Sequence, residues 1–135
     1  MSEENAEIIR RLYAAFNEGD ADAVCEGFTD DAEFRPAFIG GGIVEGAVYR
    51  GRDGIAEFVE VQNETWRSLT ADPVTIQDLG SRILVEVRLE AVGRASGVAV
   101  NRTTWNVFEL RDRKVAAGRV YPTKAEALEA AGVDG

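Results

Sequence analysis

Apolar residues in the first half of the chain recur at the three- and four-residue spacing of an α-helix. The first such segment ends near Gly19, which can adopt the left-handed conformation of a helix terminus, and Asp20 is a favourable cap for a second, short helix. A third apolar stripe runs from Asp53 to Leu69, with Gln62 as its one polar member. The pattern therefore predicts three helices, the first of which carries Ile8, Ile9, Leu12, Tyr13 and Phe16 on one face.

The pattern changes to a period of two residues after Pro73. Short turns join the alternating segments, which predicts antiparallel strands. These segments span residues 74–78, 82–92, 97–110 and 114–121. In the second of them, apolar and charged side chains separate onto opposite faces: Ile83, Val85, Val87 and Leu89 on one, Glu86, Arg88 and Glu90 on the other.

Helices first and a meander of strands second predict one α+β domain over residues 1–135. We expect a cone-shaped, curved antiparallel β-sheet wrapped on the three helices of the N-terminal half. A short C-terminal helix follows, because Thr123 and Glu126 form a capping box and Gly132 can end the helix. A sheet bent over helices usually leaves a cavity between the two layers.

Two segments between the helices raise the question of catalysis. In "FTDDAEFRP", Phe28 to Pro36, acidic residues crowd the start of a predicted strand. We interpret "TDD" as the end of the second helix, followed by the strand "AEFRP", rather than as a catalytic pair. The glycine-rich segment from Ala37 to Gly51 lacks the ending of a phosphate loop and is typical of a lid or turn.

Composition excludes several functions. The formal net charge of −9 and the scattered basic residues argue against nucleic acid as a partner. The chain has no histidine and a single cysteine, so histidine-dependent catalysis, histidine zinc sites, cysteine clusters and internal disulfides are excluded, and we expect neither metal nor cofactor. No apolar run is long enough for a membrane span, and the acidic N-terminus is unlike a signal peptide, so we expect a cytoplasmic protein.

The order of several sequence blocks resembles the SnoaL-like branch of the nuclear transport factor 2-like superfamily, which includes the ketosteroid isomerases. The blocks are "RRLYAAFNEGDADAVCEGFTDDAEFRP", "VYRGRDGIAEF", "GRASGVAV" and "VFELRDRKVAAGRVYPTKAEALEAAG", which together cover nearly the whole chain. The resemblance implies the cone fold. It does not fix a reaction, because the family includes isomerases, polyketide cyclases, epoxide hydrolases, dehydratases and non-catalytic pocket proteins.

The catalytic positions of these relatives are mostly occupied by other residue types here. The isomerase tyrosine position falls on Leu12, beside Tyr13, and the general-base position falls on Pro36. The late aspartate position falls near Asn106, or on Thr104 in a different alignment of the turn. The resemblance therefore implies a pocket without the usual catalytic residues. Positions used by epoxide-hydrolase-like members fall near Val87, Leu89 and Val120, which are apolar.

Pocket-lining candidates come from the inward sides of the predicted helices and strands. Arg102 is ambiguous, because it either points into the cavity or lies at the sheet rim in a salt bridge. The candidates are Tyr13, Phe16, Phe34, Phe38, Tyr49, Phe58, Trp66, Val87, Arg102, Thr104, Asn106 and Val120.

These patterns favour a protein that binds a small, largely apolar molecule in its cavity. One alternative is a polyketide cyclase, isomerase or dehydratase-type enzyme that uses Tyr13 or Tyr49 with Arg102 or Asn106; another is a non-catalytic structural or protein-interaction module. The outer sheet face mixes aromatic and charged residues, as interfaces do, so we also expect a homodimer. Its interface would include Glu86, Arg88, Glu90, Thr103, Trp105 and Val107.

Overall fold

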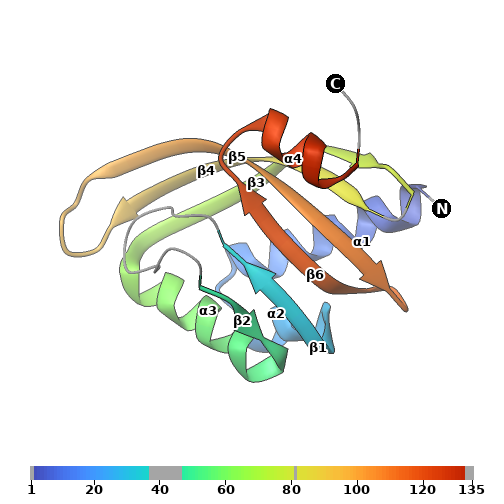
Figure 1. The fold of residues 1–135 in the computed structure, drawn as a ribbon. Helices are drawn as coiled ribbons and strands as arrows, with labels where there is room; N and C mark the ends of the chain where they lie inside the picture. Colours follow the sequence, from blue (N-terminus) through green and yellow to red (C-terminus); the bar gives the residue numbers. More distant parts are fainter. Residues whose placement is uncertain (1, 37–46, 81, 133–135) are drawn as a thin grey trace.

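The computed structural model describes residues 2–36, 47–80 and 82–132 (Figure 1). Four helices and six strands occur in these ranges. In chain order they are α1 (Ser2–Asn17), α2 (Ala21–Glu26), β1 (Phe28–Arg35), β2 (Tyr49–Arg50), α3 (Gly51–Thr65), β3 (Trp66–Asp78), β4 (Ile83–Gly93), β5 (Ala99–Arg111), β6 (Lys114–Tyr121) and α4 (Lys124–Ala130). None of the helices in this part of the chain has the length and apolar character needed to cross a membrane.

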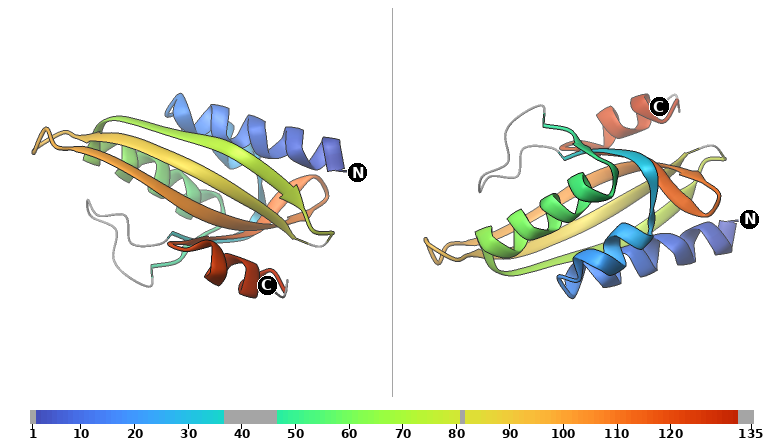
Figure 2. Two further views of the ribbon diagram at one scale, coloured as in Figure 1. Left: turned by 90° about the horizontal axis from the view of Figure 1, so that it is seen from above. Right: turned by 90° about the horizontal axis from the view of Figure 1, so that it is seen from below.

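The strands form one curved sheet in the order β2-β1-β6-β5-β4-β3. The pairings are antiparallel except that β1 runs parallel to β6. Helices α1, α2 and α3 cover one face of the sheet, and α4 lies on the opposite face (Figure 2). The expected α+β architecture is thus confirmed, and the sheet is mixed rather than wholly antiparallel.

The helix-terminus signals of the sequence act as predicted. The backbone N–H of Ala23 donates to Asp20 Oδ1 at 3.1 Å, and that of Glu126 donates to Thr123 Oγ1 at 3.2 Å. Gly19 has φ of +70°, so it turns the chain between α1 and α2 in a conformation that other residues rarely adopt. The side chains of Asp20 and Thr123 thus fix the starts of α2 and α4.

The predicted end of the third helix was wrong. Helix α3 stops at Thr65, whose hydroxyl donates to the carbonyl of Val61 at 2.7 Å, and Trp66 already begins β3. Leu69 therefore belongs to a strand. Pro73 hid this strand from the sequence pattern, but β3 lies at the edge of the sheet, where a residue without an N–H is tolerated, and the ladder is irregular directly after it.

The segment "TDD" was also misassigned. Helix α2 ends at Glu26, and strand β1 starts at Phe28, so Thr29 to Asp31 are part of the strand. The cause lies in β6, because the N–H of Val115 donates to the carbonyl of Gly27 at 2.8 Å and holds the chain in the sheet directly after the helix. Residues 37–46 of the expected lid lie outside the described residues.

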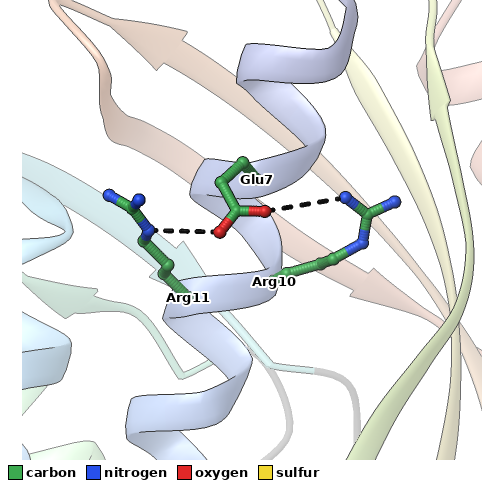
Figure 3. Close-up of polar contacts among 3 residues, drawn as sticks. All are labelled: Glu7, Arg10 and Arg11. Atoms are coloured by element: carbon green, nitrogen blue, oxygen red, sulfur yellow. Dashed lines mark hydrogen bonds and ion pairs between the residues drawn. The ribbon is translucent and has the colours of Figure 1, made fainter.

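Helix α1 is polar on one side and apolar on the other. Its buried side includes Ile9, Leu12 and Tyr13, whereas Glu7 on its exposed side pairs with Arg10 at 3.8 Å and Arg11 at 3.3 Å (Figure 3). Exposed pairs of this kind contribute little to stability. The apolar side therefore decides where the helix docks.

The C-terminal end of α1 is fastened to the edge of the sheet. The side-chain amide of Asn17 donates to the carbonyl of Ala71 at 2.9 Å, and Asn17 Oδ1 accepts from the N–H of Ala71 at 2.7 Å. This two-point contact replaces the neighbour that edge strand β3 lacks. It also fixes the position of the C-terminal end of α1 relative to β3.

Close packing around Gly118 brings two aromatic rings together over β6. A Cβ atom at this position would lie 2.9 Å from ring carbons of Phe108 and 3.0 Å from the ring of Phe34. Real Cβ atoms essentially never lie as close as 2.9 Å to another heavy atom, so a side chain at this position forces the ring of Phe108 to shift.

The substitution Gly118→Ala is expected to lower the free energy of unfolding by about 1–3 kcal/mol, because the added methyl overpacks the core. Urea unfolding of the purified variant measures this loss. In the double variant Gly118→Ala/Phe108→Leu the smaller side chain relieves the clash, so the combined loss should be less than the sum of the two single losses. Simple additivity of the two changes would contradict the packing explanation.

Candidate functional site

A cavity of about 80 Å³ lies between the sheet and the helices. Helices α1 and α2 and strands β1, β3, β4, β5 and β6 all contribute to its wall. The lining residues are Leu12, Tyr13, Phe16, Val24, Phe28, Phe34, Ala71, Val87, Leu89, Thr104, Asn106, Phe108 and Val120. The wall is apolar except for three neighbouring side chains, from α1 and β5.

These three side chains form a buried hydrogen-bonded chain. Thr104 Oγ1 donates to Asn106 Oδ1 at 3.3 Å, and Asn106 Nδ2 donates to the hydroxyl oxygen of Tyr13. Thr104 and Asn106 are two residues apart and so share the inward side of β5. Tyr13 comes from the buried side of α1. The chain therefore joins the first helix to the middle of the sheet.

Two donors of this chain remain for another molecule. A tyrosine hydroxyl can donate one proton besides accepting, and a side-chain amide carries two N–H groups. With Nδ2 using one of them on Tyr13, the second N–H of Asn106 and the O–H of Tyr13 have no hydrogen-bond acceptor in the described part of the chain. Both groups belong to the cavity wall.

Burial raises the pKa of Tyr13 well above its ordinary range, and the hydrogen bond from Asn106 lowers it by less. The hydroxyl is therefore neutral at any physiological pH. It can donate a hydrogen bond besides the one that it accepts from Asn106, whereas action as a base would need a phenolate that this environment disfavours.

No carboxylate, lysine or arginine belongs to the cavity wall as described. Pro36, at the family's general-base position, is buried and cannot titrate. Asp31 of the segment "FTDDAEFRP" is exposed, and hydrogen bonds from Thr29 and Arg111 hold the pKa of its carboxyl below the usual range. Asp31 thus makes contacts at the protein surface and is not part of the cavity wall. Groups of three or more acidic or cysteine side chains that could hold a metal ion do not occur in the described ranges.

Some of the predicted pocket residues do not reach the cavity. Phe58 is packed among the rings of Phe16, Phe34 and Tyr49, at 6.1, 5.0 and 5.2 Å between ring centres, so it and Tyr49 belong to the core behind the wall. Trp66 is the first residue of β3 and lies in the wall of a neighbouring groove instead. Phe38 lies outside the described residues. The predicted residues that do line the cavity are Tyr13, Phe16, Phe34, Val87, Thr104, Asn106 and Val120.

Arg102 lies on the cavity face of the sheet but outside the cavity. It pairs with Leu89 across the ladder, so its side chain leaves the same face of the sheet as that cavity residue. It is nevertheless exposed and is not part of the cavity wall, which places it at the rim.

Several wall residues were missing from the predicted set: Leu12, Val24, Phe28, Ala71, Leu89 and Phe108. Period-two alternation was sufficient to find Phe108, which follows Asn106 on the inward face of β5, and Leu89, which follows Val87 on β4. Ala71 had no such signal, because its strand was not recognised.

The outer sheet face holds most of the residues expected at a dimer interface. Glu86 lies opposite Trp105, and Arg88 lies opposite Thr103. Val107 is different, since it is buried in a small apolar cluster with Leu84 of β4 and Ala127 of α4. Helix α4 therefore already covers one end of this face within the chain, so Val107 is not accessible to a second copy.

The sequence profile of the SnoaL-like domain matches residues 9–118, which is most of the chain. The chain belongs to the SnoaL-like family. This SnoaL-like chain has the nuclear transport factor 2-like fold, which also underlies ketosteroid isomerases, as its structural neighbours show. No curated protein matches the sequence significantly.

Solved structures share the fold over nearly the full chain. A protein of ketosteroid isomerase-like fold from Catenulispora acidiphila, in complex with trimethylamine, is 15% identical, with coverage of 95% of this chain and 94% of that one and a TM-score of 0.77. TerC, co-crystallised with polyporic acid, is 21% identical, with coverage of 93% and 96% and a TM-score of 0.77. Bal32a, from a soil-derived mobile gene cassette, is 27% identical, with coverage of 96% of each chain and a TM-score of 0.76.

The raised pKa of Tyr13 predicts a specific dependence of stability on pH. An unfolded tyrosine loses its proton near pH 10, whereas folded Tyr13 keeps it, so above about pH 10 the folded state binds more protons and stability falls as pH rises. Below that pH this group adds no slope. Urea unfolding at several values between pH 8 and 11 is expected to show a steeper alkaline loss in the wild type than in Tyr13→Phe. Parallel curves for the two proteins would contradict the burial of this hydroxyl.

Proposed function

We propose that this SnoaL-like protein binds a small, largely apolar molecule that carries one oxygen acceptor, such as a ketone. The O–H of Tyr13 and the second N–H of Asn106 donate to that oxygen, while the apolar wall contacts the rest of the molecule. The observation that carries the proposal is this pair of unused buried donors in a wall that is otherwise apolar. Pockets of this composition suit molecules that are apolar with a few fixed polar contacts.

Binding is favoured over catalysis by the titration behaviour of the wall. Proton transfer needs a group whose pKa lies near the working pH. Tyr13 is the one ionisable group among the lining residues, and its pKa is raised away from that range. The cyclase, isomerase or dehydratase alternative would need a further base, and none of the described wall residues supplies one.

The volume of the cavity limits what it holds. An apolar cavity of about 150 Å³ is known to take up benzene. The present volume of about 80 Å³ is smaller, so a ring-sized ligand enters only when a wall side chain moves. Two proteins of this fold were crystallised with small organic molecules of different size, one with trimethylamine and TerC with polyporic acid, which supports the proposal.

Cyclohexanone and methylcyclohexane form a matched pair for the test, because one has a carbonyl oxygen and the other has none. Titration followed by nitrogen-edited NMR is expected to shift the side-chain amide signal of Asn106 with cyclohexanone. The variant Asn106→Leu removes a donor and should weaken cyclohexanone binding by about tenfold, the equivalent of roughly 1.4 kcal/mol, while methylcyclohexane binds both proteins alike.

Val87→Trp is the control for location, since it fills the cavity and should abolish both interactions. Equal affinity of wild type and Asn106→Leu for cyclohexanone would contradict the proposed polar contact. Binding of both compounds to Val87→Trp would place them elsewhere.

We also propose a homodimer through the outer sheet face. Arg88 lies between Glu86 and Glu90 on the outward side of β4, so two copies related by a two-fold axis can pair opposite charges. Native mass spectrometry is expected to give twice the chain mass for the wild type and a monomer for Arg88→Glu, which reverses the central charge. Lys114→Glu, beside the turn between β5 and β6, makes the same charge change outside the face and should stay dimeric. A monomeric wild type would overturn this interface.

A further inference from the structure

A second hollow, a groove of about 440 Å³, lies where the C-terminal ends of α1 and α3 meet the start of β3. Phe16 is the one described residue common to its wall and the wall of the cavity, so the two spaces meet at this side chain. The other groove residues are Asn17, Glu18, Gly19, Gln62, Asn63, Trp66, Arg67, Ser68, Leu69, Thr70 and Arg94.

Gln62 in the groove wall carries an unsatisfied polar atom. The side chain is only 2% exposed, and its Oε1 accepts from Trp66 Nε1 at 3.1 Å. Its Nε2 has no acceptor among the described residues. A buried donor without an acceptor costs about 1–3 kcal/mol, and an apolar residue in this stripe of α3 would avoid that cost. The fold accounts for Oε1, which is the acceptor for Trp66, but not for Nε2, so Nε2 is the atom that an acceptor arriving with a ligand would satisfy.

Phe16 is placed to control access to this amide. Its ring stacks on Phe58 at 6.1 Å between centres, with 17° between the planes. Gln62 follows Phe58 by one turn of α3, on the same side of the helix. Phe16 and Gln62 both belong to the groove wall, so a rotation of the half-buried Phe16 away from Phe58 would open the groove towards the cavity beside Gln62.

The charge of the groove suits an anionic group. Arg94 donates to the carbonyls of Glu64, Asn63 and Trp66 and so closes the C-terminal end of α3. Arg67 makes no ion pair with a carboxylate of the described chain. The C-terminal ends of α1 and α3 carry partial negative charge, which Arg94 offsets at α3. Glu18 is the one acidic residue in this wall as described, so Arg67 is the cation that remains for an anionic group.

We propose that the groove is a second subsite and the way into the cavity for an apolar molecule that ends in a carboxylate. Gln62 Nε2 donates to the carboxylate, the guanidinium of Arg67 adds an opposite charge, and Phe16 moves aside so that the apolar body reaches the cavity. This inference rests on the proposed function, because the body of the ligand occupies the cavity described above.

The test uses Trp66 as a reporter of the groove. The chain has two tryptophans, so Trp105→Phe leaves Trp66 alone, and its fluorescence can be followed during titration. One probe is 4-cyclohexylbutanoate, whose ring enters the cavity while its carboxylate stays in the groove. The other is cyclohexanone, which occupies the cavity alone and is followed by the amide signal of Asn106, as above.

In this background, Gln62→Leu is expected to weaken 4-cyclohexylbutanoate binding by about tenfold and to leave cyclohexanone binding unchanged. Gln62→Glu retains an acceptor for Trp66 but puts a carboxylate oxygen in place of the N–H donor. It should weaken the binding of 4-cyclohexylbutanoate at least as strongly. Gln77→Leu makes the same chemical change at an exposed position of β3 and should have no effect. Phe16→Ala should raise the association rate of 4-cyclohexylbutanoate in stopped-flow measurements.

The outcomes separate the two proposals. If both Gln62 variants bind 4-cyclohexylbutanoate within twofold of the parent while cyclohexanone still binds, the groove subsite is overturned and the cavity function stands. If the parent binds neither probe, the proposed function fails together with the subsite. Selective loss of the carboxylate probe supports the subsite, and an unchanged association rate in Phe16→Ala would remove Phe16 from the route.

Discussion

The hydrogen bond between Tyr13 and Asn106 is the constraint on which the relation of helices and sheet depends. Apolar contacts decide which side of α1 faces the sheet, but they have no direction of their own. A buried polar pair behaves differently, because any shift that separates the partners leaves two groups unsatisfied in a low-dielectric interior. The contact of Asn17 with Ala71 fixes the same helix at the sheet edge, so α1 is held at two points of known register.

Local signals were sufficient for most of the fold because they act within a few residues. Asp20 and Thr123 cap helices whatever lies around them, and the alternation of apolar and charged residues on β4 shows directly which side is buried. The mistakes occurred where a distant partner decides the structure. Trp66 continues an apolar helical stripe, yet pairing with β4 makes it a strand residue, and the residues after Gly27 are drawn into the sheet by β6. Neither partner is visible from the neighbouring sequence.

The site was harder to predict than the fold, because its composition depends on distances between elements. The sequence indicated that Tyr13 and Asn106 face inward, but it could not show that they touch. Alignment with family positions pointed to Leu12 instead, and the structure places both residues of this helix in the wall. Phe58 shows the opposite case: it faces inward as expected, but other aromatic rings enclose it, so it is core rather than wall. Only the packing of neighbouring side chains decides whether an inward residue lines the cavity or is enclosed in the core.

Two buried donors without an acceptor support the proposed ligand path from the groove to the cavity. The O–H of Tyr13 belongs to the cavity and Nε2 of Gln62 to the groove, and each lacks an acceptor in the described chain. Tyr13 and Phe16 are three residues apart on α1 and so lie on the same side, with Phe16 between the two spaces. Each side chain also has a partner in the fold, Asn106 for Tyr13 and Trp66 for Gln62, so only the one donor of each is left over. Buried donors without an acceptor occur mainly at functional sites, and here the two lie in spaces that share the ring of Phe16.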